Sequence, residues 1–297
     1  MKLKRLTAIL LSLVLAASLA APVHAASSFR DIEDSAVALD AEVLRLMGVV
    51  GGVGENNFNP EANLTRAEFC TMVIRLIGRE AEADNHKNRT IFRDVTARHW
   101  GRGYINLAAS ITVGSGSTRL IAGVGDGRFL PDDAITYAQA VTILMRVLGY
   151  SDSDAGAIWP DGYLKLAASV GLTEGLTLGA GDLLPRARAA ELFANLLTTP
   201  TAAGAVYYTT LGSAVENVLV LDVDTMEETG AIRTSKGMYY VAADVPAPSA
   251  LEGFCGTLVL NGKKEIITFI PDGSRARTIT LGSDAQASYL KDTTGVR

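Results

Sequence analysis

The sequence predicts a mainly α-helical protein of three tandem helix-turn-helix repeats, followed by a small all-β domain. The first observation is that Gly52–Pro60 returns almost unchanged as Gly123–Pro131. The second is that Gly103–Ser110 returns as Gly162–Ser169. The third is a change in residue pattern from Val206 on, where short runs of β-branched and aromatic residues appear. Repeated units usually bury their apolar faces on each other and leave grooves between copies, which favours a binding module over an enzyme.

The three repeats are expected at residues 26–80, 81–150 and 151–200, with the β domain at 201–297. Their first helices are expected near residues 35–47, 104–110 and 162–170, and their second helices from residues 65, 136 and 186. In the β domain, Asn261-Gly262 separates two apolar runs and predicts a hairpin, because both residue types tolerate positive φ. Asp272-Gly273 is a second candidate turn. A barrel-like domain and a sandwich both fit this pattern.

The first 25 residues predict a signal peptide. Lys2, Lys4 and Arg5 form a positive n-region, Leu6–Leu19 is an apolar run, and small residues precede a cleavage point after Ala25. A retained membrane anchor fits less well, because the run is shorter than the roughly 20 residues that span a bilayer. We therefore expect an exported protein with no membrane association after cleavage.

Composition narrows the class of partner. The chain has 297 residues, 48% of them hydrophobic, and a formal net charge of −5 without long runs of Lys or Arg, so no nucleic-acid partner is expected. The few histidines are isolated, and no metal or cofactor is predicted. Cys70 and Cys255 lie in different halves of the chain. A disulfide between them is conceivable, but two small buried side chains are the default interpretation.

The start of each second helix carries the most informative residues. Thr65 and Glu68 are spaced as a capping box, in which each side chain bonds a free backbone N–H of the helix start. Thr136 and Gln139 repeat this spacing in the second unit. Helix initiation explains these four residues. The third unit lacks the box, although Pro185 still suits a helix start.

Arg66 needs a different explanation, because capping requires no cation and the helix dipole mildly disfavours one there. A guanidinium beside the free N–H groups of a helix start suits a carboxylate or a phosphate. The alternative is a solvated arginine, or one paired with a nearby acid such as Asp31 or Asp94.

The order of motifs in the three units resembles the S-layer homology (SLH) domain family. Each unit opens with an aromatic residue two positions before an aspartate, at Phe29–Asp31, Phe92–Asp94 and Trp159–Asp161. A helix and a glycine-rich turn follow, and then Leu-Thr-Arg-Ala-Glu at Leu64–Glu68 or a variant of it. The resemblance covers residues 29–199, about three-fifths of the chain.

The resemblance implies a pseudo-threefold bundle whose grooves bind secondary cell-wall polysaccharide, often through a pyruvate ketal on an amino sugar. The family's anion-binding arginine corresponds to Arg66 and Arg186. Trp100 and Trp159 could stack on a sugar face, or else pack in the core. Tyr137 replaces the arginine in the second unit, so that groove binds a sugar hydroxyl or is purely structural. We therefore expect one or two working grooves.

The resulting hypothesis is a non-catalytic protein of the bacterial cell wall or S-layer, anchored non-covalently by its repeats, with the β domain displayed outward. One alternative is a wall-remodelling or carbohydrate-active enzyme in the C-terminal domain. That domain is small and has no evident acid/base pair. Another alternative is an S-layer subunit that self-associates through the β domain.

Overall fold

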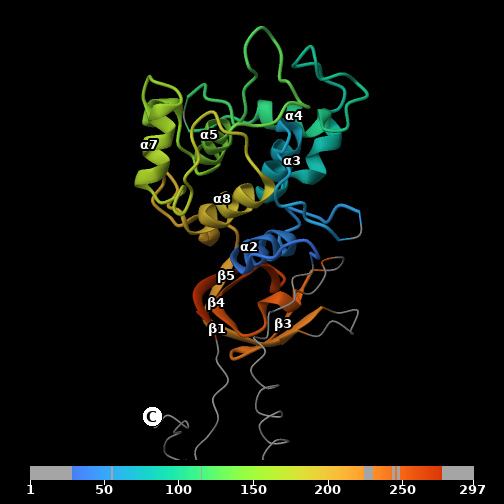
Figure 1. The fold of residues 1–297 in the computed structure, drawn as a ribbon, viewed down its shortest axis with the longest axis vertical. Helices are drawn as coiled ribbons and strands as arrows, with labels where there is room; N and C mark the ends of the chain where they lie inside the picture. The colour runs from blue at the N-terminus through green and yellow to red at the C-terminus, as the bar shows by residue number, and fades with distance from the viewer. Residues whose placement is uncertain are drawn as a thin grey trace, which may run out of the picture.

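The structure is a computed structural model that describes residues 29–54, 56–114, 116–223, 230–242, 245 and 248–275. The predicted signal peptide lies outside these residues. Figure 1 shows a helical region above a small β-barrel, and this arrangement confirms a helical repeat region followed by a small β domain. Within the described part of the chain, no helix has the length and apolar character needed to cross a membrane.

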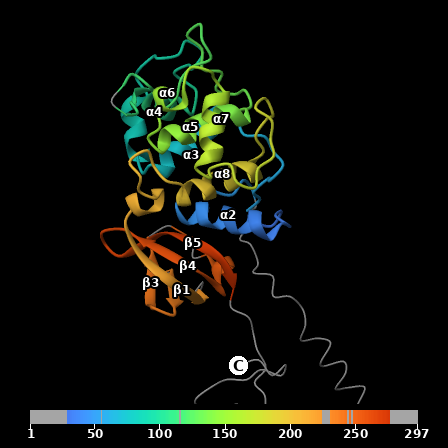
Figure 2. The same ribbon diagram turned by 90° about the vertical axis from the view of Figure 1, so that its left-hand side faces the viewer.

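Each repeat contributes two main helices, close to the predicted positions. They are α2 (Ser35–Leu46), α3 (Arg66–Leu76), α4 (Arg102–Ser110), α5 (Tyr137–Val147), α7 (Asp161–Ser169) and α8 (Arg186–Thr198). Short helices occupy the connections: η1 (Glu80–His86), α6 (Asp152–Ala155), η2 (Tyr207–Thr210) and η3 (Ser249–Leu251). Every second helix packs on the first helix of another repeat, α3 on α4, α5 on α7 and α8 on α2, so the three repeats close into a ring (Figures 1 and 2).

Backbone hydrogen bonds join the starts of the three second helices. The N–H of Leu64 donates to the carbonyl oxygen of Leu184 (3.0 Å), that of Leu184 to Ile135 (3.0 Å), and that of Ile135 back to Leu64 (2.9 Å). The three side chains are buried at the centre of the helical region. Since the bonds form a closed cycle, each repeat stabilises the helix starts of the others.

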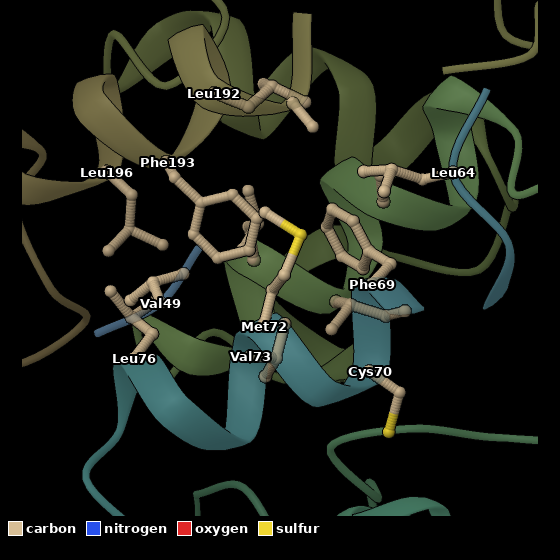
Figure 3. Close-up of a cluster of buried hydrophobic side chains, with 14 of the residues drawn as sticks. Val49, Leu64, Phe69, Cys70, Met72, Val73, Leu76, Leu192, Phe193 and Leu196 are labelled. Atoms are coloured by element: carbon tan, nitrogen blue, oxygen red, sulfur yellow. The ribbon is translucent and has the colours of Figure 1, made fainter. Parts of the chain in front are cut away.

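The helical core lies where α3 meets α8. Figure 3 shows Phe69 and Met72 of α3 beside Phe193 and Leu196 of α8, and the rings of Phe69 and Phe193 are 5.3 Å apart between centroids. All four side chains are buried. The apolar residues of α3 predicted from the i, i+3, i+4 spacing thus face the neighbouring repeat, which is why one repeat cannot bury its apolar surface alone.

The glycines of the second sequence echo have a steric cause. A Cβ atom at Gly103 would lie 2.3 Å from the carbonyl oxygen of Ala83, and one at Gly162 would lie 2.0 Å from that of Ala155. In both repeats the first helix therefore starts against the backbone of the preceding connection. Only glycine permits this approach.

The C-terminal domain is a closed five-stranded barrel in the order β1-β2-β3-β5-β4. Its strands are β1 (Ser213–Val223), β2 (Ala231–Thr234), β3 (Gly237–Val241), β4 (Phe254–Leu260) and β5 (Glu265–Arg275). Neighbouring strands are antiparallel, except β3 and β5, which pair in parallel and close the barrel. Closure leaves no open sheet edge among the five described strands.

Two turn predictions need correction. The β4–β5 hairpin exists, but its loop has four residues, 261–264, and the positive φ falls at Lys264. Asn261 shapes the loop through its side-chain oxygen, which accepts the N–H groups of Lys263 and Glu265. The turn predicted at Asp272-Gly273 is wrong, because both residues lie inside β5. They form part of a bulge opposite β4, where a glycine at φ 80° is readily accommodated.

Helix α2 belongs to both parts of the molecule. Its Leu46 is buried among the barrel residues, and α2 also packs on β5 and η3. From the barrel side, Val259 and Ile270 join the helical core. The barrel is thus fixed directly to the first repeat, and Figure 2 shows α2 lying between α8 and the barrel.

The cysteines are free thiols in this arrangement. Cys70 is buried in α3, as the default interpretation expected, whereas Cys255 in β4 is partly exposed. Burial raises the pKa of the Cys70 thiol to about 12, so this group stays protonated and unreactive.

Candidate functional site

The three helix pairs define three junctions between repeats. Junction A lies between α5 and α7, junction B between α8 and α2, and junction C between α3 and α4. The predicted candidate residues are distributed over all three. At junction A, side chains from three repeats line one cavity of about 370 Å³, among them Arg66, Gln139, Thr142, Arg146 and Trp159.

Arg66 is a buried cation held by backbone oxygens. Its side chain is only 5% exposed, its Nε donates to the carbonyl of Phe129 (2.7 Å), and its Nη2 donates to that of Ala122 (3.2 Å). The guanidinium also lies 4.5 Å from the centroid of the Phe129 ring. Burial lowers the pKa of Arg66 from its usual value, but an arginine stays charged. Among the described residues no carboxylate forms an ion pair with it, and Asp31 and Asp94 instead accept backbone N–H groups.

The prediction that free N–H groups of the helix start help to bind an anion is wrong. The N–H of Arg66 donates to Asp133, and that of Ala67 donates to Pro131. The next free N–H, that of Glu68, is capped by Thr65. Arg186 and Ala187 are occupied in the same way, by carbonyls of repeat one. A ligand at Arg66 therefore meets the arginine side chain without these helix N–H groups, and at Arg186 the first two N–H groups of the helix are likewise occupied by another repeat.

The capping pairs act as helix-starting residues. Thr65 and Glu68 form a reciprocal box at α3. Thr136 and Gln139 form one at α5, with longer bonds of 3.3 and 3.4 Å. Gln139 also lines the junction A cavity.

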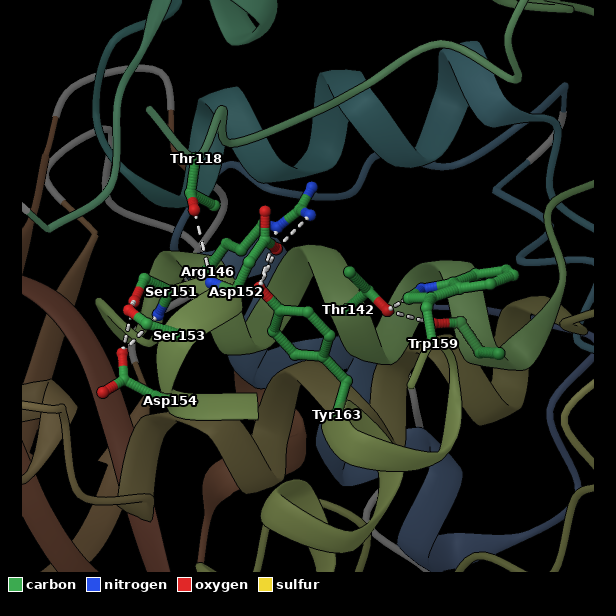
Figure 4. Close-up of polar contacts among 10 residues, drawn as sticks. Thr118, Thr142, Arg146, Ser151, Asp152, Ser153, Asp154, Trp159 and Tyr163 are labelled. Atoms are coloured by element: carbon green, nitrogen blue, oxygen red, sulfur yellow. Dashed lines mark hydrogen bonds and ion pairs between the residues drawn. The ribbon is translucent and has the colours of Figure 1, made fainter. Parts of the chain in front are cut away.

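Trp159 is 56% exposed at the rim of junction A, and it is not a core residue. Its Nε1 donates to the hydroxyl of Thr142 (3.0 Å), which fixes the ring beside the cavity (Figure 4). Exposed aromatic faces of this kind stack on sugar rings and other apolar surfaces. The position agrees with the stacking interpretation of this residue.

A second arginine completes junction A. Arg146 donates from Nη2 to Asp152 (2.8 Å) and from Nε to the hydroxyl of Tyr163 (3.1 Å), and Tyr163 donates to the same Asp152 oxygen (2.7 Å). Burial acts to raise the pKa of Asp152, but the bonds from Tyr163 and Arg146 outweigh it and keep the carboxyl ionised. Arg146 is therefore charge-balanced, unlike Arg66.

Junction C repeats much of this chemistry. Arg186 donates from Nε to the carbonyl of Phe58 (2.6 Å), and its guanidinium lies 4.9 Å from the Phe58 ring centroid. Arg75 and Tyr104 both donate to Glu80, as Arg146 and Tyr163 do to Asp152. Trp100 is 54% exposed and stacks on His99, so the core-packing alternative fails for this residue as well.

Comparison with known proteins agrees with this architecture. The S-layer homology domain model matches residues 47–70 and 117–141. The chain belongs to the S-layer homology family. The matched segments contain the helix starts at Arg66 and Tyr137, the positions where the first two SLH units differ.

The SLH chain is also similar to named surface proteins. It is 36% identical to a cell surface protein of Thermoanaerobacter kivui over 202 residues, 67% of this chain and 25% of that protein. It is 31% identical to a surface layer protein of Brevibacillus choshinensis over 143 residues, covering 48% and 12% respectively. A cellulosome-anchoring protein of Acetivibrio thermocellus is 30% identical over 103 residues, covering 35% and 21%. The matched region is thus a quarter or less of each relative.

Junction B departs from the other two SLH junctions. Tyr137 stands where Arg66 and Arg186 stand elsewhere, and it is buried. Glu191 of α8 occupies the place that Thr142 has in α5, because each lies six residues after the N-cap of its helix. Asp40 of α2 faces this helix, and burial together with Glu191 and Asp34 raises its pKa to about 7. Arg188 pairs with Glu191 (2.8 Å), so the junction has no unpaired cation to offer an anion among the described residues.

Three residues of the SLH site escaped prediction from sequence: Thr142, Arg146 and Tyr163. A signal for two of them was present. Arg146 follows Thr136 at the spacing with which Arg75 follows Thr65, and Tyr163 and Tyr104 share the repeated Gly-Tyr pair. Recurrence at equivalent positions relates Arg146 and Tyr163 of junction A to Arg75 and Tyr104 of junction C.

Asp40→Asn is expected to stabilise the protein at pH 7–8 by about 1–3 kcal/mol. The pKa of Asp40 is about 7 in the fold and near its ordinary value when unfolded, so the folded state binds the extra proton. Stability should accordingly fall as pH rises from about 4 to about 7 and level off above, and the variant should lose this slope. Urea unfolding at several pH values measures this pH dependence of the unfolding free energy. Glu33→Gln, at an exposed site, is the control, and an unchanged slope in Asp40→Asn would contradict the assignment.

Proposed function

We propose that this chain anchors an exported protein to the bacterial cell wall by binding an acidic secondary cell-wall polysaccharide at junctions A and C. The observation that carries the proposal is a pair of guanidiniums, the buried Arg66 and the half-buried Arg186, which bond backbone carbonyls and form no ion pair with a carboxylate among the described residues. A buried charge without a counter-ion is costly, so an anionic ligand would be bound favourably.

The ligand chemistry follows from the atoms left over at junction A. Nε and one hydrogen of Nη2 of Arg66 are occupied, which leaves Nη1 and the second Nη2 hydrogen for an incoming carboxylate. The carboxylate of a pyruvate ketal fits this donor pair. The exposed ring of Trp159 would cover the apolar face of the same sugar.

The bundle would present two equivalent sites and one different one. The closed cycle of backbone bonds at Leu64, Ile135 and Leu184 supports a pseudo-threefold arrangement of the repeats. Junction B would be structural, because it has Tyr137 in place of the arginine and two additional carboxylates, Asp40 and Glu191. Two weak sites on one rigid module raise the avidity for a repeating polymer well above the affinity of either site.

The SLH units and the surface-protein relatives place the chain at the cell wall or S-layer. They favour a non-catalytic anchor in this part of the molecule. The barrel, fixed to α2, would then be held at a defined orientation above the wall instead of on a flexible connection.

The experiment is a sedimentation assay of the protein with purified walls, before and after removal of the pyruvyl groups. Binding should be strong to intact walls and largely lost on the stripped walls. Raising the salt concentration should weaken binding at junction A only modestly, because Arg66 is buried and poorly screened. Equal binding to stripped walls would refute the role of the carboxylate.

A further inference from the structure

We propose that a groove formed within repeat two binds an acidic peptide with small aliphatic residues, the chemistry of the stem peptides in peptidoglycan. The groove has a volume of about 500 Å³ and lies between the end of α4, the connection before Phe92 and the segment that leads to Gly123. Its cations are Arg89 and Arg119, which do not line the junction A cavity. The site would add a second wall component to the polysaccharide of the proposed function.

One side of the groove is a feature of repeat two that repeat one lacks. The connection from the first helix to the echoed glycine runs over 111–122 in repeat two, but only over 47–51 in repeat one. Thr112 and Arg119 form a β-bridge, and the N–H of Leu120 donates to the carbonyl of Ile111 (2.9 Å). The chain thereby returns to the end of α4, where Nη1 of Arg119 donates to the carbonyl of Ser110 (3.2 Å).

The opposite side, which carries Arg89, is held by two buried side chains of α4. Arg102 donates from Nε to the carbonyl of Lys87 (2.7 Å) and from Nη2 to the hydroxyl of Thr90 (2.8 Å). Asn106 donates from Nδ2 to the carbonyl of Arg89 itself (2.8 Å). Both sides of the groove are therefore built on the same helix, and binding would need little ordering beyond the two arginine side chains.

The two arginines give the groove a surplus of positive charge. Both side chains are exposed, and neither forms an ion pair with a carboxylate in the part of the chain that the structure describes. Arg119 uses one Nη1 hydrogen on Ser110 and keeps its Nε and Nη2 hydrogens for a ligand. Each guanidinium can thus hold one carboxylate in the two-bond geometry that arginine favours.

The floor of the groove indicates what lies between the carboxylates. It is aliphatic, formed by Ala109, Ile121 and Ile91, and Ile91 is 42% exposed. Phe92 is buried, so its ring offers no broad face on which a sugar could stack. A bare anion would use the arginines alone, whereas a peptide with small apolar side chains would cover the floor as well. An acidic peptide therefore fits the groove better than a sugar or an inorganic anion.

Titration calorimetry of the full chain tests the site. The probe is an N-acetylated tripeptide of alanine, γ-linked glutamate and alanine, which carries two carboxylates, and its diamide is the uncharged control. The tripeptide should bind and the diamide should not. Arg89→Gln and Arg119→Gln should each weaken binding about five-fold. Arg98→Gln makes the same charge change at an exposed site outside the groove and should leave the affinity unchanged.

A variant of the floor distinguishes a peptide site from a plain anion site. Ile91→Gln should weaken tripeptide binding about three-fold and leave the binding of inorganic phosphate unchanged. The proposal is refuted if the tripeptide does not bind the folded parent, if phosphate binds as tightly, or if Arg98→Gln weakens binding as much as Arg89→Gln.

The outcome is independent of the proposed function. The double variant Arg89→Gln, Arg119→Gln should lose the tripeptide and still bind a pyruvylated monosaccharide, because neither residue lines the junction A cavity. Loss of peptide binding alone would thus leave the polysaccharide sites standing. A parent protein that binds the tripeptide but no pyruvylated sugar would refute the proposed function and support this groove.

Discussion

Arg66→Ala should reduce the number of sugar-binding sites on the protein from two to one. The affinity of junction A for a pyruvylated monosaccharide is expected to fall about 30-fold or more, since removing one partner of a buried charged contact costs about 2–5 kcal/mol. The remaining site at junction C should bind as before, because Arg66 and Arg186 reach different junctions. Calorimetric titration with the monosaccharide reads the stoichiometry and the affinity together.

The companion variants make the prediction specific. Arg186→Ala should leave junction A as the remaining site, and the double variant should bind no sugar. Tyr137→Phe, which removes only a hydroxyl at junction B, should leave both sites intact. Because Arg66 also bonds Phe129 and Ala122, the thermal midpoint of each variant must be recorded. Two full sites in a folded Arg66→Ala protein, or a lost site in Tyr137→Phe, would contradict the assignment.

Much of the helical fold could be predicted from the sequence, because its signals are local. The capping spacing at Thr65 and Thr136 and the glycine-ended apolar helices have their causes within a few residues, and the helices begin and end near the expected positions. The barrel was harder to predict. The β5 bulge at Asp272-Gly273 depends on its pairing with β4, and a local turn signal cannot reveal that pairing.

The candidate residues come from the sequence, but their bonding could not be predicted from it. Arg66 was correctly expected to need an explanation, but the carbonyls of Ala122 and Phe129 that hold it are 56 and 63 residues away in sequence. The carbonyls that accept the N–H groups of its helix start are similarly far away in sequence, so a local pattern cannot reveal them. Contacts across a ring of repeats depend on how the repeats close, and only the structure supplies that information.

Leu46→Ala is expected to destabilise the helical region and the barrel together, by about 2–5 kcal/mol. Leu46 is 2% exposed on α2, yet it packs among the barrel residues, while α2 also packs on α8. A cavity at this position would weaken the barrel's attachment to α2, the helix that packs on both parts. Since Val259 and Ile270 join the helical core from the barrel side, neither part can lose this contact without exposing apolar surface of the other.

Differential scanning calorimetry distinguishes this shared core from two independent domains. The parent should unfold in one transition, and Leu46→Ala should move that whole transition to lower temperature. Leu258→Ala, which removes a leucine from the same barrel cluster but from strand β4, is the matched variant and should also shift the single transition. If the barrel were an independent spacer, Leu258→Ala would lower a separate barrel transition and leave the helical one in place. Such a result would contradict the coupling through α2, and the barrel would then be free to change its orientation relative to the wall-binding repeats.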